Sequence, residues 1–220
     1  MSGREAGATT ARERMLANVR RALGRAAGQL PASLAAPRLQ ILLSDRKVYT
    51  SLFVQNFENL GGKSMLVREN SAVSGALASL LEGKRVVVSN SPFLADCGIT
   101  KLAGVQSGFT DRDALRGACV DADIGITSTD YALADTGTLV LLASPSEARM
   151  ISLLPPVHVA VLPRSRLLAN LDELFGILPG PAEETSSMVM ITGPSRTADI
   201  EQILVRGVHG PGEIYAVIVG

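Results

Sequence analysis

The chain has 220 residues, of which 46% are hydrophobic and 19% charged, and its 21 basic residues balance its 21 acidic ones. This composition excludes a disordered chain, and the neutral balance argues against a protein that binds nucleic-acid phosphates. The apolar runs are strand-sized, so the sequence predicts no membrane span of ~20 residues.

The first predicted element is a helix over residues 9–24, which Gly24 ends. Its apolar residues recur at helical spacing: Met15, Leu16, Val19 and Leu23. Residues 31–37 begin and end with a proline and are typical of a linker. We therefore expect residues 1–37 to form a helical arm, packed on the domain or on a partner, and residues 38–220 to form the main domain.

From residue 41 onward, the hydrophobic patterning predicts alternating helices and strands. Helices are predicted over residues 44–60, 71–81, 111–119, 144–154, 165–175 and 195–205. Strands are predicted over residues 64–67, 85–89, 123–127, 138–143, 157–162, 188–192 and 214–219. Apolar strands in this alternation indicate the α/β class, with a mostly parallel sheet covered by helices.

One predicted helix start has a complete set of capping signals. Ser144 is the expected N-cap, Pro145 the first helical residue, and Glu147 the residue that closes a capping box. The sequence therefore predicts that the Glu147 side chain turns back to the backbone of its own helix.

The ten-residue link that follows residue 127 contains the first group of candidate site residues. Paired carboxylates divide general acid and base work when burial separates their pKa values, and a glycine permits close approach of a ligand. The candidates are Asp130 and Asp135 for proton transfer and Thr136, Gly137 and Thr138 for binding an anion. The alternative is a set of turns and hydroxyl caps that bind only their own backbone.

A second candidate loop follows the predicted strand at 188–192. A Gly-Pro turn there leads into a predicted helix N-terminus, whose free N–H groups and dipole attract anions. A neighbouring arginine would add a bidentate contact to phosphate or carboxylate. The candidate anion-binding residues are Gly193, Ser195, Arg196 and Thr197. The alternative is an ordinary capped helix without a ligand.

The two histidines differ in their sequence surroundings. His209 lies among three glycines and a proline and is a candidate base or hydrogen-bond donor to an anion. The alternative is an ordinary hydrogen-bonded loop histidine. His158 lies in an apolar predicted strand, so we expect it in the core or in an interface.

The chain has too few cysteines for an iron–sulfur cluster or a zinc site. Cys97 and Cys119 are separated by 21 residues and form no CxxC pair, whereas such sites usually take four ligands. We expect two buried free thiols, no metal and no cofactor. The first ten residues lack the apolar core of a signal peptide, so a cytoplasmic protein is the expectation.

Two long blocks resemble a known family. They are DTGTLVLLASPSEARMISLLPPVHVAVLPRSRL and ITGPSRTADIEQILVRGVHGPGEIYAVIVG, and the N-terminal RERMLANVRRALGR fits as well. Together they closely resemble the LUD-domain family, and within it the lactate-utilisation protein C branch. The resemblance spans most of residues 40–220.

The resemblance implies a three-layer, Rossmann-like fold of the NagB/RpiA/CoA-transferase group. It also implies a role in bacterial growth on L-lactate, where three co-encoded proteins oxidise lactate to pyruvate. Two of them carry iron–sulfur motifs, and this chain resembles the third. A looser analogy to ribose-5-phosphate isomerase supports Asp130 and Asp135 by fold alone.

Three functional hypotheses follow. In the first, the chain is the non-redox component of a lactate-oxidising system, binds a small anion, and has iron–sulfur proteins as partners. In the second, it is a stand-alone acid–base enzyme acting on a phosphorylated or carboxylated metabolite. In the third, it is a purely structural partner protein. The sequence does not decide whether the chain is itself an enzyme, and it leaves a homo-oligomer open.

Overall fold

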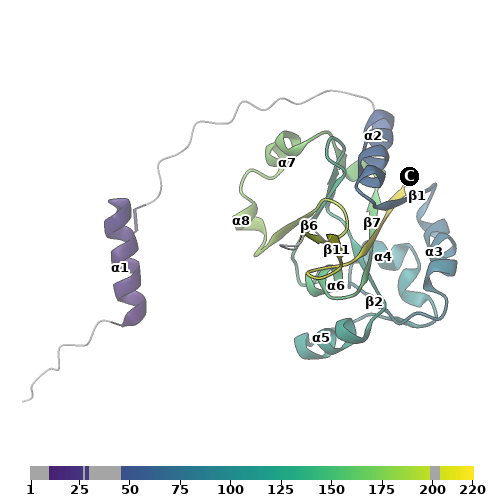
Figure 1. Cartoon of the computed structure of the whole chain (residues 1–220), viewed down its shortest axis with the longest axis horizontal. Coiled ribbons are helices and arrows are strands. Elements are labelled where there is room, and N and C mark those ends of the chain that lie inside the picture. The colour runs from purple at the N-terminus through teal and green to yellow at the C-terminus, as the bar shows by residue number, and fades with distance from the viewer. Residues whose placement is uncertain (1–9, 27, 30–45, 199–203) are drawn as a thin grey trace, which may run out of the picture. The chain divides into compact units, whose positions relative to one another are not determined.

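The computed structural model describes residues 10–26, 28, 29, 46–198 and 204–220 (Figure 1). The chain divides into two compact units, Met1–Arg38 and Leu39–Gly220, and each is described by itself.

The first unit contains one described helix, α1 (Ala11–Leu23), close to the prediction. Thr10 caps it, because its hydroxyl accepts from the backbone N–H of Glu13 while the Glu13 carboxylate accepts from the N–H of Thr10. Gly24 ends the helix in the left-handed conformation. The apolar side chains of Met15, Val19 and Leu23 are exposed.

The second unit is built on a six-stranded sheet in which every pairing is parallel. The strands lie in the order β1 (Lys63–Val67), β12 (Glu213–Val219), β7 (Val157–Pro163), β4 (Ile124–Ser128), β2 (Val86–Val88) and β3 (Val105–Gln106). The predicted α/β class and mostly parallel sheet are confirmed.

Alternating strand residues bury both faces of this sheet, as β7 shows. Val159 and Val161 pack on one face, which is covered by α3 (Val73–Leu81) and α4 (Pro92–Asp96). Ala160 and Leu162 pack on the other. That face is covered by α2 (Arg46–Asn59), α5 (Arg112–Asp121), α6 (Met150–Leu153) and a second sheet. Single turns at Asn70–Ala72 and Ile99–Lys101 precede α3 and follow α4.

The second sheet has four strands, in the order β8 (Leu167–Leu168), β5 (Tyr131–Leu133), β6 (Thr138–Leu142) and β9 (Met188–Ile191). It packs against α2 through a cluster that includes Phe53, Phe57 and Leu139. Two short helices, α7 (Leu171–Ile177) and α8 (Pro181–Glu184), lie beside it on the far side of the domain from α3 (Figure 1). Strand β5 lies inside the stretch that the sequence predicted to be an irregular link.

Two predicted helices contain strands in their described residues. The prediction over 165–175 covers a single turn at Arg164–Arg166, strand β8 and the start of α7. There, pairing with β5 and burial of Leu167 and Leu168 override helix propensity. The prediction over 195–205 covers an antiparallel pair, β10 (Arg196–Ala198) and β11 (Leu204–Arg206), with residues 199–203 outside the described part.

A glycine is required where the second sheet meets α2. Gly137 has φ +64°, and a Cβ atom there would lie 2.5 Å from the backbone nitrogen of Phe57. The glycine therefore allows close approach of a helix, and its role in binding an anion stays a prediction.

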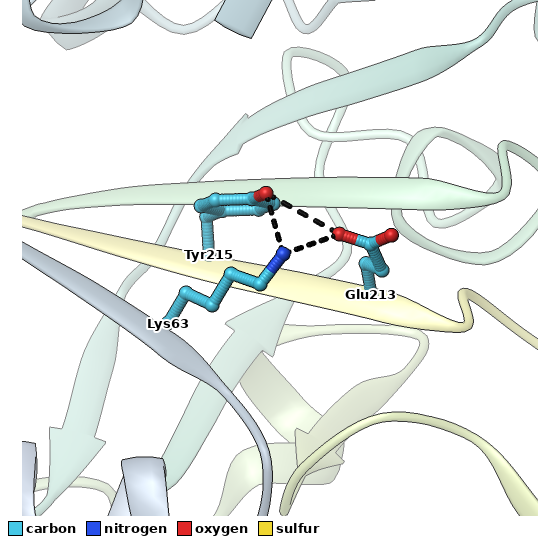
Figure 2. A network of polar contacts seen from close by, with 3 residues as sticks. All are labelled: Lys63, Glu213 and Tyr215. Carbon is cyan, nitrogen blue, oxygen red and sulfur yellow. Dashed lines mark hydrogen bonds and ion pairs between the residues drawn. The ribbon is translucent and has the colours of Figure 1, made fainter.

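At the amino ends of β1 and β12, an exposed polar cluster joins the two strands (Figure 2). Lys63 Nζ donates to Glu213 Oε2 at 2.7 Å and to Tyr215 Oη at 2.9 Å, and it lies 4.8 Å from the Tyr215 ring centroid. These bonds raise the pKa of Lys63 to about 12, and the bond from Lys63 lowers the pKa of Glu213.

Candidate functional site

The carboxyl group of Glu147 is buried at the carboxyl ends of two neighbouring strands. Its Oε1 atom accepts from Ser89 Oγ at 2.8 Å, from the Ser128 backbone N–H at 3.0 Å, and from Ser128 Oγ. Ser89 follows β2, and Ser128 is the last residue of β4. Open parallel sheets bind ligands at this edge, so Glu147 occupies the position where a functional group is expected.

The turn that carries Glu147 differs from the predicted helix start. Ser144 does act as a cap, because its hydroxyl accepts from the Glu147 N–H at 3.1 Å. The Ser144 N–H, however, donates to the backbone carbonyl of Glu147 at 3.2 Å, and α6 begins only at Met150. The capping-box prediction is wrong because the two serines at the strand ends bind the Glu147 carboxyl instead.

Burial raises the pKa of Glu147 from 4.5 to about 7. The hydrogen bonds from Ser128 and Ser89 oppose this shift because they stabilise the charged form, while the charge of Asp130 adds to it. Near neutral pH, the protonated and ionised forms of Glu147 are therefore both populated. A carboxyl group with this property can donate and accept a proton under physiological conditions.

The second carboxyl oxygen, Oε2, is buried without a hydrogen-bond partner. Glu147 lines a small void of about 10 Å³ together with Thr127 and Ser152. A void of that size holds about one water molecule, and buried polar atoms rarely remain unpaired. The void therefore has room for about one water molecule or one ligand atom beside the buried Glu147 carboxyl group.

Asp130 is the one predicted catalytic residue that lies beside Glu147. It follows β4, its Oδ2 accepts from the Leu142 N–H at 2.7 Å, and burial raises its pKa. The Leu142 hydrogen bond and the charge of Arg166 oppose that shift. The structure thus places two carboxyl groups, Asp130 and Glu147, near enough for the charge of Asp130 to raise the pKa of Glu147, and burial raises the pKa of both.

Asp135 lies at the other end of β5 and is exposed. Four residues separate it from Asp130, and three of them form β5, which rises about 10 Å along the strand. The side-chain amide of Asn56, on α2, donates to the carbonyl of Asp135 at 2.9 Å. The predicted acid–base pair of Asp130 and Asp135 is therefore not one site in this structure.

Some of the predicted anion-binding residues lie near the C-terminal end of α2. The hydroxyls of Thr136, Thr138 and Thr192 form a chain with O···O distances of 2.8 and 2.9 Å. Gly193 packs on Leu60, and Arg196 donates to the Leu60 carbonyl.

The second candidate loop lacks its helix. The Ser195 N–H donates to the Pro211 carbonyl at 2.9 Å, and the Ser195 carbonyl accepts from the Gly207 N–H at 3.0 Å. These bonds close a hairpin at β10, so the prediction of a helix N-terminus is wrong. For Gly193, Ser195, Arg196 and Thr197, anion binding stays a prediction without that support.

His209 is exposed in the loop that leads into β12. Gly212, near the end of this loop, donates to the carbonyl of Pro156, the residue before β7. His209 therefore lies toward the amino edge of the central sheet, opposite to Glu147. Its role in proton transfer also stays a prediction.

His158 is fully buried on β7, as expected for a core residue. Its Nε2 is 2.8 Å from Thr127 Oγ1, and burial lowers its pKa to about 3, so the ring is neutral. Cys97 and Cys119 are buried free thiols, and burial raises the pKa of each to about 11. Among the described residues, no three His, Cys, Asp or Glu side chains cluster as metal ligands, and no helix has the length and apolar character to span a membrane.

The LUD domain family model matches residues 50–219, which include both sheets and the Glu147 site. The chain belongs to the LUD domain family. The match confirms the resemblance in the sequence blocks. Sequence reasoning missed Glu147 because its spacing from Ser144 fitted a helix cap, and only the sheet order brings Ser89 and Ser128 to it.

Several curated relatives of this LUD domain carry the name Lactate utilization protein C. The protein from Halalkalibacterium halodurans is 35% identical over 147 residues, which cover 62% of this chain and 64% of that one. The protein from Shouchella clausii is 43% identical over 93 residues, or 41% of each chain. The protein from Anoxybacillus flavithermus is 37% identical over 134 residues, or 59% and 60%. The chain spans less than two thirds of the length of these relatives.

A solved structure shares the fold. A DUF162 family protein from Deinococcus radiodurans superposes with a TM-score of 0.63 and 21% identity, covering 81% of this chain and all of that one.

Proposed function

We propose that this LUD domain takes part in bacterial L-lactate utilisation, as a component that binds a small carboxylate and exchanges a proton with it through Glu147. The relatives named lactate utilization protein C support the process. The chain contains two cysteines, too few for a four-thiolate cluster of its own, so we assign electron transfer to iron–sulfur partner proteins.

The observation that carries the chemical part is the environment of Glu147. Its carboxyl group is held by two serines at the strand ends, has a pKa of about 7, and keeps one oxygen without a partner. When protonated, Glu147 donates a hydrogen bond to a ligand oxygen. When ionised, it accepts the proton of a ligand hydroxyl.

Asp130 tunes this site by its charge. An anionic ligand beside Asp130 and Glu147 meets less repulsion when Glu147 is neutral, and the ligand raises the pKa of Glu147 in turn. The affinity for lactate or pyruvate is therefore expected to fall as the pH rises above about 7.

The test is reconstitution of lactate oxidation from this chain and its iron–sulfur partners. Glu147→Gln preserves the size of the side chain and the oxygen that accepts from the serines but removes the titrating proton. We expect it to lower the turnover about a hundredfold, in line with general acid–base contributions. Glu82→Gln, at an exposed glutamate after α3, is the matched control and is expected to leave turnover unchanged.

The outcomes separate the two parts of the proposal. Undiminished lactate oxidation without this chain would remove its role in the process. If oxidation requires the chain but Glu147→Gln retains full turnover, the assignment of Glu147 is wrong.

The pairing of Asp130 with Glu147 also favours a second function, a stand-alone acid–base enzyme acting on a carboxylated or phosphorylated metabolite. Such an enzyme exchanges a carbon-bound hydrogen with solvent without partners. Deuterium incorporation from D₂O into pyruvate or a sugar phosphate by the isolated chain would support this function. Absence of incorporation, with full activity in the reconstituted system, would support the first.

A further inference from the structure

Three arginines line one pocket beside the Glu147 site, and one of them, Arg149, also lines the void at Glu147. The pocket measures about 430 Å³ and lies between α5 and α6. Its lining residues are Arg112, Arg116, Arg149, Met150, Leu153 and Leu154, with no acidic residue among them.

No ion pair among the described residues neutralises the positive charge of this pocket. Within residues 46–198 and 204–220, ion pairs form at Lys63 and Arg85 but at none of the three pocket arginines. Arg149 donates from Nη1 to Ser187 Oγ at 3.1 Å, which orients its guanidinium group and leaves its other N–H donors available.

Helix stability does not account for the two pocket arginines on α5, Arg112 and Arg116. Arg112 is the first residue of α5, where the helix dipole disfavours a cation. Arg112 and Arg116 are one turn apart, and like charges at that spacing repel each other. Asp111 and Asp113 in the same turn offset part of this cost, but Asp111 is already used as the cap of α5, accepting from Ala114.

The pocket also has an apolar side. Of its lining residues, Leu154 is 46% exposed, and Met150 and Leu153 are half-buried. A ligand that fits both parts carries negative charge at one end and an apolar body at the other.

We propose that this pocket binds a small organic polyanion, with the chemistry of a phosphate or diphosphate ester. Guanidinium groups bind phosphate oxygens bidentately, and the pocket volume falls within the range of small-molecule sites. The Glu147 carboxyl group does not line this pocket, so the inference does not rest on the proposed function.

Calorimetric titration at low ionic strength tests the proposal, with ADP as the probe. Inorganic pyrophosphate and adenosine, each representing one half of ADP, are the comparison arms. We expect ADP to bind more tightly than either half, and binding to weaken as sodium chloride is added. The double variant Arg112→Gln/Arg116→Gln is expected to bind ADP at least tenfold more weakly.

The control is Arg12→Gln/Arg14→Gln on α1, which removes the same charge from the other unit and is expected to retain full affinity. Thermal unfolding checks that the pocket variant is folded, and removal of the repulsive pair is expected to leave its midpoint unchanged or higher. Glu147→Gln is expected to bind ADP as the unsubstituted chain does. Any one of four results would overturn the proposal. Two concern the unsubstituted chain: no ADP binding at millimolar concentration, or pyrophosphate binding as tight as that of ADP. The other two concern variants: equal weakening of ADP binding in Arg12→Gln/Arg14→Gln, or loss of ADP binding in Glu147→Gln.

Discussion

Two polar clusters lie at opposite edges of the central sheet, and each is built around a glutamate. At the carboxyl ends of β2 and β4, Glu147 is 9% exposed and accepts from two neutral serines. At the amino ends of β1 and β12, the Glu213 side chain is 52% exposed and accepts from a lysine (Figure 2). The pKa of Glu147 rises to about 7, whereas that of Glu213 falls.

The difference shows what prepares a carboxyl group for proton transfer. Hydrogen bonds lower the pKa in both clusters, so donors alone do not distinguish them. Burial without a cationic partner distinguishes the two clusters, because it disfavours the ionised form of Glu147. The Lys63–Glu213 pair stays ionised near neutral pH and is suited to joining two strands.

The largest effect on stability is expected from the pH dependence that Glu147 creates. Its pKa is higher in the folded than in the unfolded chain, so its stabilising proton is fully bound below about pH 4.5. That stabilisation is lost as the pH rises through about 7. The shift corresponds to about 3 kcal/mol in the free energy of unfolding. Urea unfolding of the unsubstituted chain and of Glu147→Gln from pH 5 to 8 measures it, since the variant lacks this slope. Parallel curves for the two chains would contradict it.

A smaller effect is expected from Ser128→Ala. The substitution removes one donor to the ionised form of Glu147, so the pKa of Glu147 should rise further. The free energy of unfolding should fall by about 2 kcal/mol at pH 8 and by less at pH 5. Urea unfolding at both pH values checks this, with Ser79→Ala on the exposed side of α3 as the control. An equal loss at both pH values would show that the Ser128 hydroxyl does not act through the charge of Glu147.

The smallest effect is expected at the exposed cluster. Lys63→Ala removes an ion pair and the contact with the Tyr215 ring. Because both charged side chains are more than half exposed, the loss should be less than about 1 kcal/mol and should shrink as salt is added. Urea unfolding at 0.05 and 0.5 M sodium chloride measures it. A loss as large as that in Ser128→Ala would remove the contrast between the clusters.

Most of the central sheet could be predicted because its signals are local. Runs such as Val86–Val88 and Val157–Pro163 are apolar, strand-sized and bounded by turn residues. The failures lie in the second sheet and the hairpin, where pairing over long distances decides the structure. Leu167 and Leu168 fit a helix by pattern, but β5 pairs with them as a strand.

The candidate site was harder to predict for the same reason. Asp130 follows a predicted strand, so the pattern points to it. Glu147 fits a helix cap by spacing, and no local pattern shows that Ser89 and Ser128, far apart in the chain, meet its carboxyl group. The neutral net charge likewise gives no sign of the pocket between α5 and α6, where three arginines form no ion pair.

The most direct test of the central claim is a measurement of the pKa of Glu147. Carbon-13 NMR of the labelled side-chain carboxyl groups, with Glu147→Gln to assign the resonance, follows its titration between pH 3 and 9. The account predicts a midpoint of about 7. A midpoint near the ordinary value of 4.5 would show that the carboxyl group is ionised and solvated, and would contradict its role as a proton donor near neutral pH.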